Sequence, residues 1–367
     1  MPSNVSEQRV SRTVNGAADS GNAVSGRAVG DSVSVIIPFH RRLTQLGRSL
    51  AAVRTSMPSA EVVLAADGAV EDCQELADAH GATVVVIAGP LGPAVARNRA
   101  AEAATGDILV FVDTDVVVAP DAIPRLCTYL ARRPEVAGVF GAYDEDPGED
   151  NFMSRYKNLS HSYIHQHARG DALTFWAGLG AVRAAAFRSV GGFNEGIRRP
   201  SVEDIELGYR LIGAGHRLGV EPAARGCHLK RWTLWGSLVT DVRDRGIPWT
   251  QLILRHRALA DDLNTKGALR WSVVLSYVFL CSIVGAWMAP PLAILAAAAL
   301  AGVVALNLPY YRWFWDREGS WFAVRVIAAH VLHHLCNGVS VVAGALLHAA
   351  DRVGLHPPGR IPEAHRQ

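Results

Sequence analysis

The fold is decided by one stretch, Ile108-Leu109-Val110-Phe111-Val112-Asp113-Thr114-Asp115. Its apolar half is typical of a strand that is buried on both faces of a sheet. Two carboxylates at the end of such a strand are costly to remove from water unless something neutralises them. A divalent cation does so, and a cation with oxygen ligands also binds a diphosphate. Because ligands of open α/β sheets bind at the carboxyl ends of strands, the stretch predicts a metal-diphosphate site; a solvated turn is the alternative.

Composition sets the limits on fold and function. The chain has 367 residues, 50% of them hydrophobic, and a formal net charge of +2 at pH 7. This length suits one large domain with an appendix, or two domains. The small net charge argues against a dedicated nucleic-acid-binding protein. The five cysteines are scattered and lack metal-ligand spacing, so we expect free thiols in a reducing compartment.

Strand and helix patterns alternate after an aperiodic beginning. Residues 1–31 have neither periodicity nor the apolar core of a signal peptide, so we expect a disordered leader. The strand and helix patterns that follow are short and alternate along the chain. This alternation indicates an α/β domain with a mainly parallel sheet and right-handed crossovers. We expect strands at 33–38, 61–66, 83–87, 108–112 and 136–142, a strand-like segment at 174–182, and helices at about 43–56, 71–80, 93–105, 152–167 and 203–212.

Six motifs follow one another along the first 260 residues. They are Val33-Ser34-Val35-Ile36-Ile37-Pro38, Asp67-Gly68, Ala96-Arg97-Asn98, Asp113-Thr114-Asp115, Gly191-Gly192-Phe193-Asn194-Glu195 and Glu203-Asp204-Ile205-Glu206-Leu207-Gly208-Tyr209-Arg210-Leu211. In order and spacing, this set resembles the family 2 inverting glycosyltransferases, over roughly residues 33–260. The resemblance implies the GT-A fold, a Rossmann-like nucleotide-diphospho-sugar transferase domain.

The resemblance also implies which residues bind the nucleotide-sugar donor. Pro38 and Asp67 would lie in the donor site, with Asp67 at the nucleobase. Arg97 would contact the nucleotide or the diphosphate; it follows a glycine-proline loop, and amides with a guanidinium suit phosphate. The metal, Mg²⁺ or Mn²⁺, would be bound by Asp115, with Asp113 near the ribose or the metal. An ordinary loop with a solvated arginine face is the alternative for Arg97.

A second pair of carboxylates, Glu203-Asp204, begins an amphipathic helix. A carboxylate at a helix N-terminus is stabilised by the helix dipole, so capping is one interpretation. Sugar transfer with inversion needs a carboxylate within hydrogen-bond reach of the acceptor hydroxyl. The resemblance implies that Asp204 is this general base and Glu203 a supporting carboxylate, with no covalent intermediate.

The acceptor site is expected in two segments. Trp176 lies among small residues and could stack on a sugar ring, or it could belong to the aromatic core. The run from Cys227 to Trp232 resembles a Gln-x-x-Arg-Trp motif of membrane-bound polymerising members, with His228 in place of Gln. Arg231 could pair with a phosphate and Trp232 could stack on the acceptor. The replaced Gln favours a single transfer, and a basic interfacial helix start is the alternative.

The C-terminal third is predicted to enter a membrane. Uncharged apolar runs at about 271–288 and 291–309 flank Pro290-Pro291 and indicate a transmembrane hairpin. Residues 310–317 resemble an aromatic belt with positive charge, which indicates a cytoplasmic interface. A third run, 322–349, contains charged residues and could span the membrane or lie on it. The amphipathic segment 234–254 could lie along the membrane surface.

The sequence thus predicts a multi-pass protein of the cell membrane with a cytoplasmic catalytic domain. We expect a leader at 1–31, a GT-A domain at 32–262, membrane-associated helices within 268–350 and a tail at 351–367. The enzyme would move a sugar from a nucleotide diphosphate donor to a lipid-linked or small acceptor. The alternatives are a polyprenyl-phosphate glycosyltransferase, a nucleotidyltransferase and a catalytically dead scaffold. The family usually has two acidic residues before Gly68; here the first is Ala66, the one feature that favours a dead scaffold.

Overall fold

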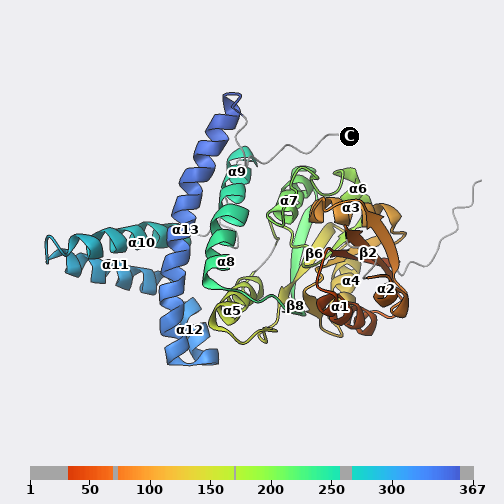
Figure 1. Cartoon of the computed structure of the whole chain (residues 1–367), viewed down its shortest axis with the longest axis horizontal. Helices are drawn as coiled ribbons and strands as arrows, with labels where there is room; N and C mark the ends of the chain where they lie inside the picture. Colours follow the sequence, from red (N-terminus) through yellow and green to blue (C-terminus); the bar gives the residue numbers. More distant parts are fainter. Residues whose placement is uncertain (1–31, 69–72, 169–170, 257–266, 356–367) are drawn as a thin grey trace, which may run out of the picture. The chain divides into compact units, whose positions relative to one another are not determined.

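A computed structural model describes residues 32–68, 73–168, 171–256 and 267–355. The predicted leader, the end of the predicted tail and the proposed domain boundary near residue 262 lie outside these ranges. Within them, eight strands form one sheet in the order β3-β2-β1-β4-β7-β6-β8-β5. Figure 1 shows part of this sheet among the helices. The strands are β1 (Val33–Phe39), β2 (Glu61–Asp67), β3 (Thr83–Ile87), β4 (Ile108–Val112), β5 (Val116–Val118), β6 (Val136–Tyr143), β7 (Leu179–Arg183) and β8 (Arg217–His228).

Helices cover both faces of the sheet. Side chains of β1 alternate between two cores: Val35 and Ile37 belong to one cluster and Ile36 to the other. The first cluster includes residues of α1, α2 and α4, and the second includes residues of α3, α6 and α7. These helices are α1 (Leu43–Ser56), α2 (Gln74–Ala79), α3 (Pro93–Ala103), α4 (Ala122–Arg132), α6 (Ala184–Ser189) and α7 (Glu203–Gly213).

The strand pairing brings several chain segments to one edge of the sheet. β1 pairs in parallel with β2 and β4, and β2 pairs in parallel with β3. The carboxyl ends of these strands therefore share an edge. β7 is antiparallel to β4, with Leu179 opposite Val112, so the residues before β7 lie at the same edge. β5 is antiparallel to β8, with Val116 opposite His228. The end of β8 therefore lies at this edge as well.

Two strand predictions are corrected by the structure. The segment 174–182 was expected to be strand-like throughout, but the strand comprises only Leu179–Arg183, because the preceding residues turn toward α7. The twelve-residue strand β8 (Arg217–His228) was not predicted. Its sequence lacks both an apolar run and a regular alternation, and its pairing with β6 shifts register between Phe140 and Ala142. Non-local pairing, rather than local pattern, determines this strand.

The remaining helices run from the sheet domain into an apolar C-terminal region. They are α5 (Phe152–Gln166), α8 (Leu234–Val239), the π-helix η1 (Thr240–Gly246), α9 (Ile247–His256), α10 (Gly267–Gly285), α11 (Leu292–Leu306), α12 (Leu308–Glu318) and α13 (Ser320–Arg352). In the described residues, α10 and α13 are long and apolar enough to cross a membrane. Helices α11 and α12 meet that test only together and are bent by 75°. The predicted second span, 291–309, is thus interrupted at Asn307, where the helix bends.

The aromatic run at 310–317 has a different environment from the one predicted. An interfacial belt should be exposed, yet Tyr310, Tyr311, Trp313 and Phe314 are buried. They form a cluster with α5, α13 and their neighbours. Trp315 remains 57% exposed. Helix α12 therefore joins α5 to α13 through an aromatic core, and this run gives no evidence about the cytoplasmic side.

A buried ion pair also joins the sheet domain to α13. The Lys157 ammonium of α5 donates to both carboxylate oxygens of Asp241 in η1, at 2.5 and 2.7 Å. His333 Nδ1 of α13 lies 3.1 Å from the same carboxylate. Burial alone would raise the pKa of Asp241, but His333 and Lys157 hold it below its usual value. Each buried charge is thus neutralised by its partner. Loss of one partner leaves the other charge buried and unpaired.

We expect Asp241→Asn to lower the free energy of unfolding by about 3–5 kcal/mol, since Lys157 would stay buried without its counter-ion. The measurement is the thermal unfolding midpoint in one detergent. Asp244→Asn is the matched control in the same helix, because its partner Arg243 is exposed and such pairs contribute below about 1 kcal/mol. Equal midpoints for the two variants would contradict the prediction.

Candidate active site

The Asp113-Thr114-Asp115 turn is fixed to three neighbouring segments at the edge of the sheet. The Asp113 amide donates to the Gly178 carbonyl at 3.1 Å, and the Thr114 hydroxyl donates to the Pro38 carbonyl at the end of β1. The Asp115 carbonyl accepts from the Leu229 amide at 2.8 Å. The backbone is thereby held, while the Asp113 and Asp115 side chains remain 32% and 25% exposed. Both carboxylates stay accessible to a ligand.

Arg97 joins the two predicted pairs of carboxylates. Its guanidinium is 4% exposed and lies 5.3 Å from the centre of the Phe193 ring. Nη2 donates to Asp113 Oδ1 at 2.6 Å, and Nη1 donates to Glu203 Oε1 at 2.9 Å. The sequence did not predict this bridge between α3, the end of β4 and the start of α7. Contact of Arg97 with the nucleotide or diphosphate stays a prediction.

His228 lies next to Asp115. Its Nε2 is 3.5 Å from Asp115 Oδ2, and its ring stacks on Tyr143 with centroids 4.5 Å apart. Burial would raise the pKa of Asp115, but His228 and the charge of Lys230 hold it below its usual value. Asp115 is therefore an anion with an imidazole beside it, a donor set that fits a divalent cation completed by water or phosphate oxygens. Among the described residues, no group of three or more His, Cys, Asp or Glu side chains already forms a metal cage.

Asp204 lies one residue inside α7, where its carboxylate is turned toward the segment before β7. Oδ2 accepts from the Ala177 amide at 3.1 Å and Oδ1 from the Ile205 amide at 2.8 Å. The N-cap of α7 is Val202, so Asp204 does not cap the helix. Burial, followed by the negative charges of Glu203 and Asp113, raises the pKa of Asp204 to about 7. A carboxylate with this pKa can accept a proton near neutral pH.

Asp67 is buried at the end of β2, and its side chain holds the glycine-proline loop. Its two carboxylate oxygens accept from the amides of Leu91 and Gly92, each at 2.8 Å. A Cβ at Gly92 would lie 1.9 Å from the Arg198 carbonyl, and its φ is +102°, so glycine is required there. Asp67 thus positions the start of α3; its predicted contact with a nucleobase is not tested by this geometry.

The predicted acceptor residues lie in two groups. Trp176 and His228 both contact the Tyr143 ring. The ring centre of Tyr143 is 4.7 Å from that of Trp176 and 4.5 Å from that of His228. Arg231 and Trp232 lie beyond the end of β8. Arg231 is exposed and pairs with Glu149 at 2.9 Å, whereas Trp232 is 6% exposed beneath Lys230.

Sequence reasoning missed Tyr143 and Lys230. Tyr143 lies one residue beyond the predicted end of its strand, at the edge where ligands bind, and this position could have indicated it. Lys230 is one of three lysines, and its charge acts on both Asp113 and Asp115. It lies within the Gln-x-x-Arg-Trp-like run, at a position that the motif leaves unspecified.

Residues 34–195 match the family model described as glycosyl transferase family 2. This part of the chain is similar to family 2 glycosyltransferases. A pre-mycofactocin glycosyltransferase of Mycobacterium tuberculosis is 31% identical over 213 residues, which cover 55% of this chain and 43% of the relative. A validoxylamine A glucosyltransferase of Streptomyces hygroscopicus subsp. jinggangensis is 28% identical over 220 residues, covering 50% of this chain and 52% of the relative. The chain thus spans about half the length of these relatives.

The fold has a solved counterpart. The mannosyltransferase PcManGT from Pyrobaculum calidifontis, in complex with GDP-Man and Mn²⁺, superposes with a TM-score of 0.51 over 89% of each chain. The sequences are 19% identical, so this likeness concerns the fold alone. Together with the family match, it confirms the predicted GT-A α/β domain followed by apolar helices. The matched residues include Asp67, Arg97, Asp113 and Asp115, while Asp204 lies beyond the matched end.

Proposed function

We propose that the chain is a metal-dependent inverting glycosyltransferase attached to a membrane. It would move one sugar from a nucleotide diphosphate donor to the hydroxyl of a lipid-linked or small acceptor. One observation carries the proposal. The metal-binding turn and the Asp204 carboxylate meet at one edge of the sheet through the antiparallel pairing of β4 and β7. This arrangement supports a charge-binding role for the turn and a base role for Asp204, whose pKa is raised to about 7.

Asp204 acts as the general base in this proposal. Each of its oxygens accepts one backbone hydrogen bond, so lone pairs remain for an acceptor hydroxyl. The hydroxyl oxygen forms a bond to the anomeric carbon as the bond from that carbon to the diphosphate breaks. Asp204 takes the hydroxyl proton, and the nucleoside diphosphate leaves. Glu203 and Arg97 hold the start of α7 in place for this step.

Asp115, with Asp113 and His228, would hold Mg²⁺ or Mn²⁺. When bound, the cation would stabilise the negative charge that develops on the leaving diphosphate. Asp113 Oδ1 is bound by Arg97, so Asp115 offers the less restrained carboxylate. A nucleotidyltransferase would need the cation but not a base at Asp204. The position of Asp204 beside the metal-binding turn therefore favours sugar transfer over the nucleotidyltransferase and dead-scaffold alternatives.

Membrane attachment is proposed from helices α10 and α13, with α11 and α12 as one bent pair. The arrangement as a multi-pass protein with its catalytic domain in the cytoplasm belongs to the same proposal. The domain limits 32–262 and 268–350 remain proposals as well.

The test is nucleotide-sugar turnover by the full chain in detergent, across a panel of donors, with and without Mn²⁺. Release of a nucleoside diphosphate with one donor, dependent on metal, supports the proposal and identifies the sugar. Release of diphosphate from a nucleoside triphosphate supplied with a sugar 1-phosphate, in a parallel reaction, would instead indicate a nucleotidyltransferase. Neither turnover nor metal-dependent binding of any nucleoside diphosphate would contradict the proposal.

The pH dependence should show the Asp204 base directly. Below pH 7 the carboxyl is increasingly protonated and cannot accept a proton, so we expect kcat/KM to fall about tenfold per pH unit below about pH 7. Glu203→Gln removes a neighbouring negative charge and should move this fall to lower pH. Donor binding measured across the same range is the control. A flat profile down to pH 5 would exclude Asp204 as the base.

A further inference from the structure

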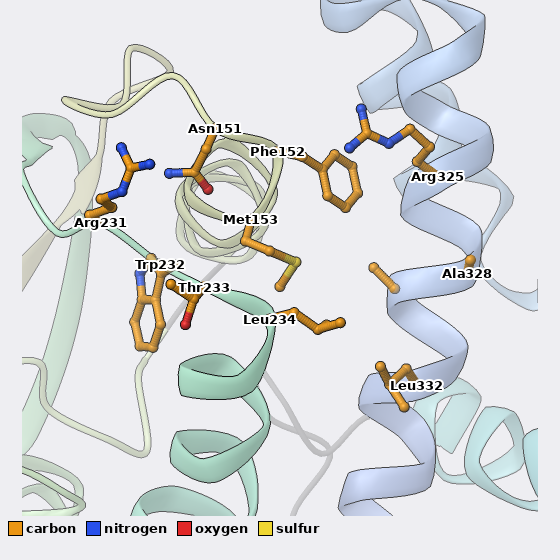
Figure 2. A pocket seen from close by; sticks show the side chains of 11 residues that line it. Asn151, Phe152, Met153, Arg231, Trp232, Thr233, Leu234, Arg325, Ala328 and Leu332 are labelled. Atoms are coloured by element: carbon orange, nitrogen blue, oxygen red, sulfur yellow. The ribbon is translucent and has the colours of Figure 1, made fainter.

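A cavity of about 620 Å³ lies between the start of α5, the segment 231–234 and α13 (Figure 2). Three parts of the chain line it, and none of them belongs to the carboxylate site. The lining residues are Asn151, Phe152, Met153, Arg231, Trp232, Thr233, Leu234, Arg325, Ala328, Ala329 and Leu332. The Trp232 amide donates to Ser154 Oγ at 2.8 Å, so two of the three walls are fixed to each other.

The cavity is apolar with positive charge at its rim. Met153 and Leu234 point toward α13 across the cavity, and Phe152 lies beside Arg325 (Figure 2). The lining contains two arginines and no carboxylate. Arg231 is paired with Glu149, outside the lining. Arg325 lies over the Phe152 ring at 3.9 Å, and within the described ranges no carboxylate pairs with it. The cavity therefore offers an uncompensated guanidinium beside an apolar wall.

The cavity is close to the carboxylate site along the chain. Leu229 donates its amide to the Asp115 carbonyl, and Arg231 follows two residues later. From His228 beside Asp115 to Arg231 the chain can span at most about 11 Å. The wall of the cavity formed by Arg231 is therefore a short distance along the chain from the residue beside Asp115.

The same cavity adjoins surfaces that suit a membrane. One wall is α13, which is apolar and long enough to cross a bilayer. Leu234 and Trp235 are 51% and 74% exposed at the start of α8, and Trp321 is 72% exposed one turn before Arg325. Exposed Trp beside Arg is typical of the membrane interface. A charged residue within an apolar helix generally has a functional partner.

We propose that this cavity binds the acceptor as an amphiphile, a lipid with a phosphate in its head and a free hydroxyl beyond it. Arg325 would bind the phosphate, because a guanidinium pairs strongly with phosphate oxygens. The apolar wall would contact the first part of the lipid's hydrocarbon chain. The phosphate is the recognition group, and the hydroxyl is the reacting atom. This inference rests on the proposed glycosyltransferase function and specifies the substrate class.

The experiment uses the full chain in phosphatidylcholine nanodiscs and a photoreactive decyl phosphate as the probe. We expect crosslinks on peptides from α5, segment 231–234 and α13, competed by decyl phosphate but not by decanol or inorganic phosphate at equal concentration. Arg325→Gln should reduce the crosslink yield about tenfold, since it removes one charge-assisted contact. Arg352→Gln, an exposed arginine at the far end of α13, is the matched control and should retain the yield.

A second pair of variants separates charge from bulk. Ala328 of α13 lines the cavity, so Ala328→Glu should repel the phosphate, while Ala328→Gln, which adds similar bulk without the charge, should bind more strongly than the Glu variant. Crosslinks elsewhere, equal competition by decanol, or an unchanged yield in Arg325→Gln would overturn the inference. If the wild type transferred sugar to a soluble acceptor but gave none of these crosslinks, this inference would be overturned while the proposed function would stand. Specific crosslinks with neither donor turnover nor metal-dependent binding of a nucleoside diphosphate would instead contradict the proposed function.

Discussion

Asp204→Asn should retain donor binding and lose sugar transfer by about 10²–10⁴-fold, the contribution typical of a general base. The amide keeps the shape of the side chain and can still accept from the Ala177 amide, but it cannot take a proton. The loss should therefore appear in kcat. The affinity for the nucleoside diphosphate, measured by calorimetry in the presence of Mn²⁺, should change little.

The control separates catalysis from helix stability. Asp121 is the N-cap residue of α4 and lies on the surface, paired with Arg125. Asp121→Asn also removes a carboxylate at a helix start, so it should reproduce any dipole effect without affecting transfer. Full turnover by Asp204→Asn would exclude this residue as the base. An equal loss in both variants would show that the effect arises from helix stability.

The parts of the fold that local sequence determines were predicted closely. The helix expected at 43–56 is α1, and the strand expected at 108–112 is β4, because periodicity and buried apolar runs specify these elements locally. The carboxylates Asp113 and Asp115 could be located for the same reason, since a strand end is a local feature.

Other features depend on pairings that periodicity does not encode. Asp204 reaches the Asp113-Thr114-Asp115 turn because β7 runs antiparallel to β4, which brings Ala177 and Gly178 beside Asp113. The buried Arg97 bridge to Glu203 spans more than a hundred residues of sequence. Burial of Tyr310 and Phe314 against α5 likewise follows from tertiary packing, whereas their composition alone resembles an interface. Such contacts between distant segments are decided by register and packing.

Asp115→Asn should remove the metal-dependent part of donor binding. Loss of residues that only support a metal ligand typically costs 10–100-fold in affinity, so loss of a direct carboxylate ligand should cost about 100-fold or more. The measurement is calorimetric binding of the nucleoside diphosphates from the donor panel, in Mn²⁺ and in chelator. Binding of Mn²⁺ alone, followed by its electron paramagnetic resonance signal, gives a readout that is independent of turnover.

The structure distinguishes the two carboxylates of this turn. Asp113 forms a 2.6 Å ion pair with the buried Arg97, so Asp113→Asn should affect both metal binding and stability. Asp115 lies 3.5 Å from His228 and makes no ion pair with the buried Arg97, so Asp115→Asn should reduce metal binding while the unfolding midpoint changes little. Asp150→Asn is the matched control, because that side chain is 98% exposed. If Asp115→Asn bound the nucleoside diphosphate with the same enhancement by Mn²⁺ as the wild type, another group would have to hold the cation, and Asp113 with His228 would be the next to test.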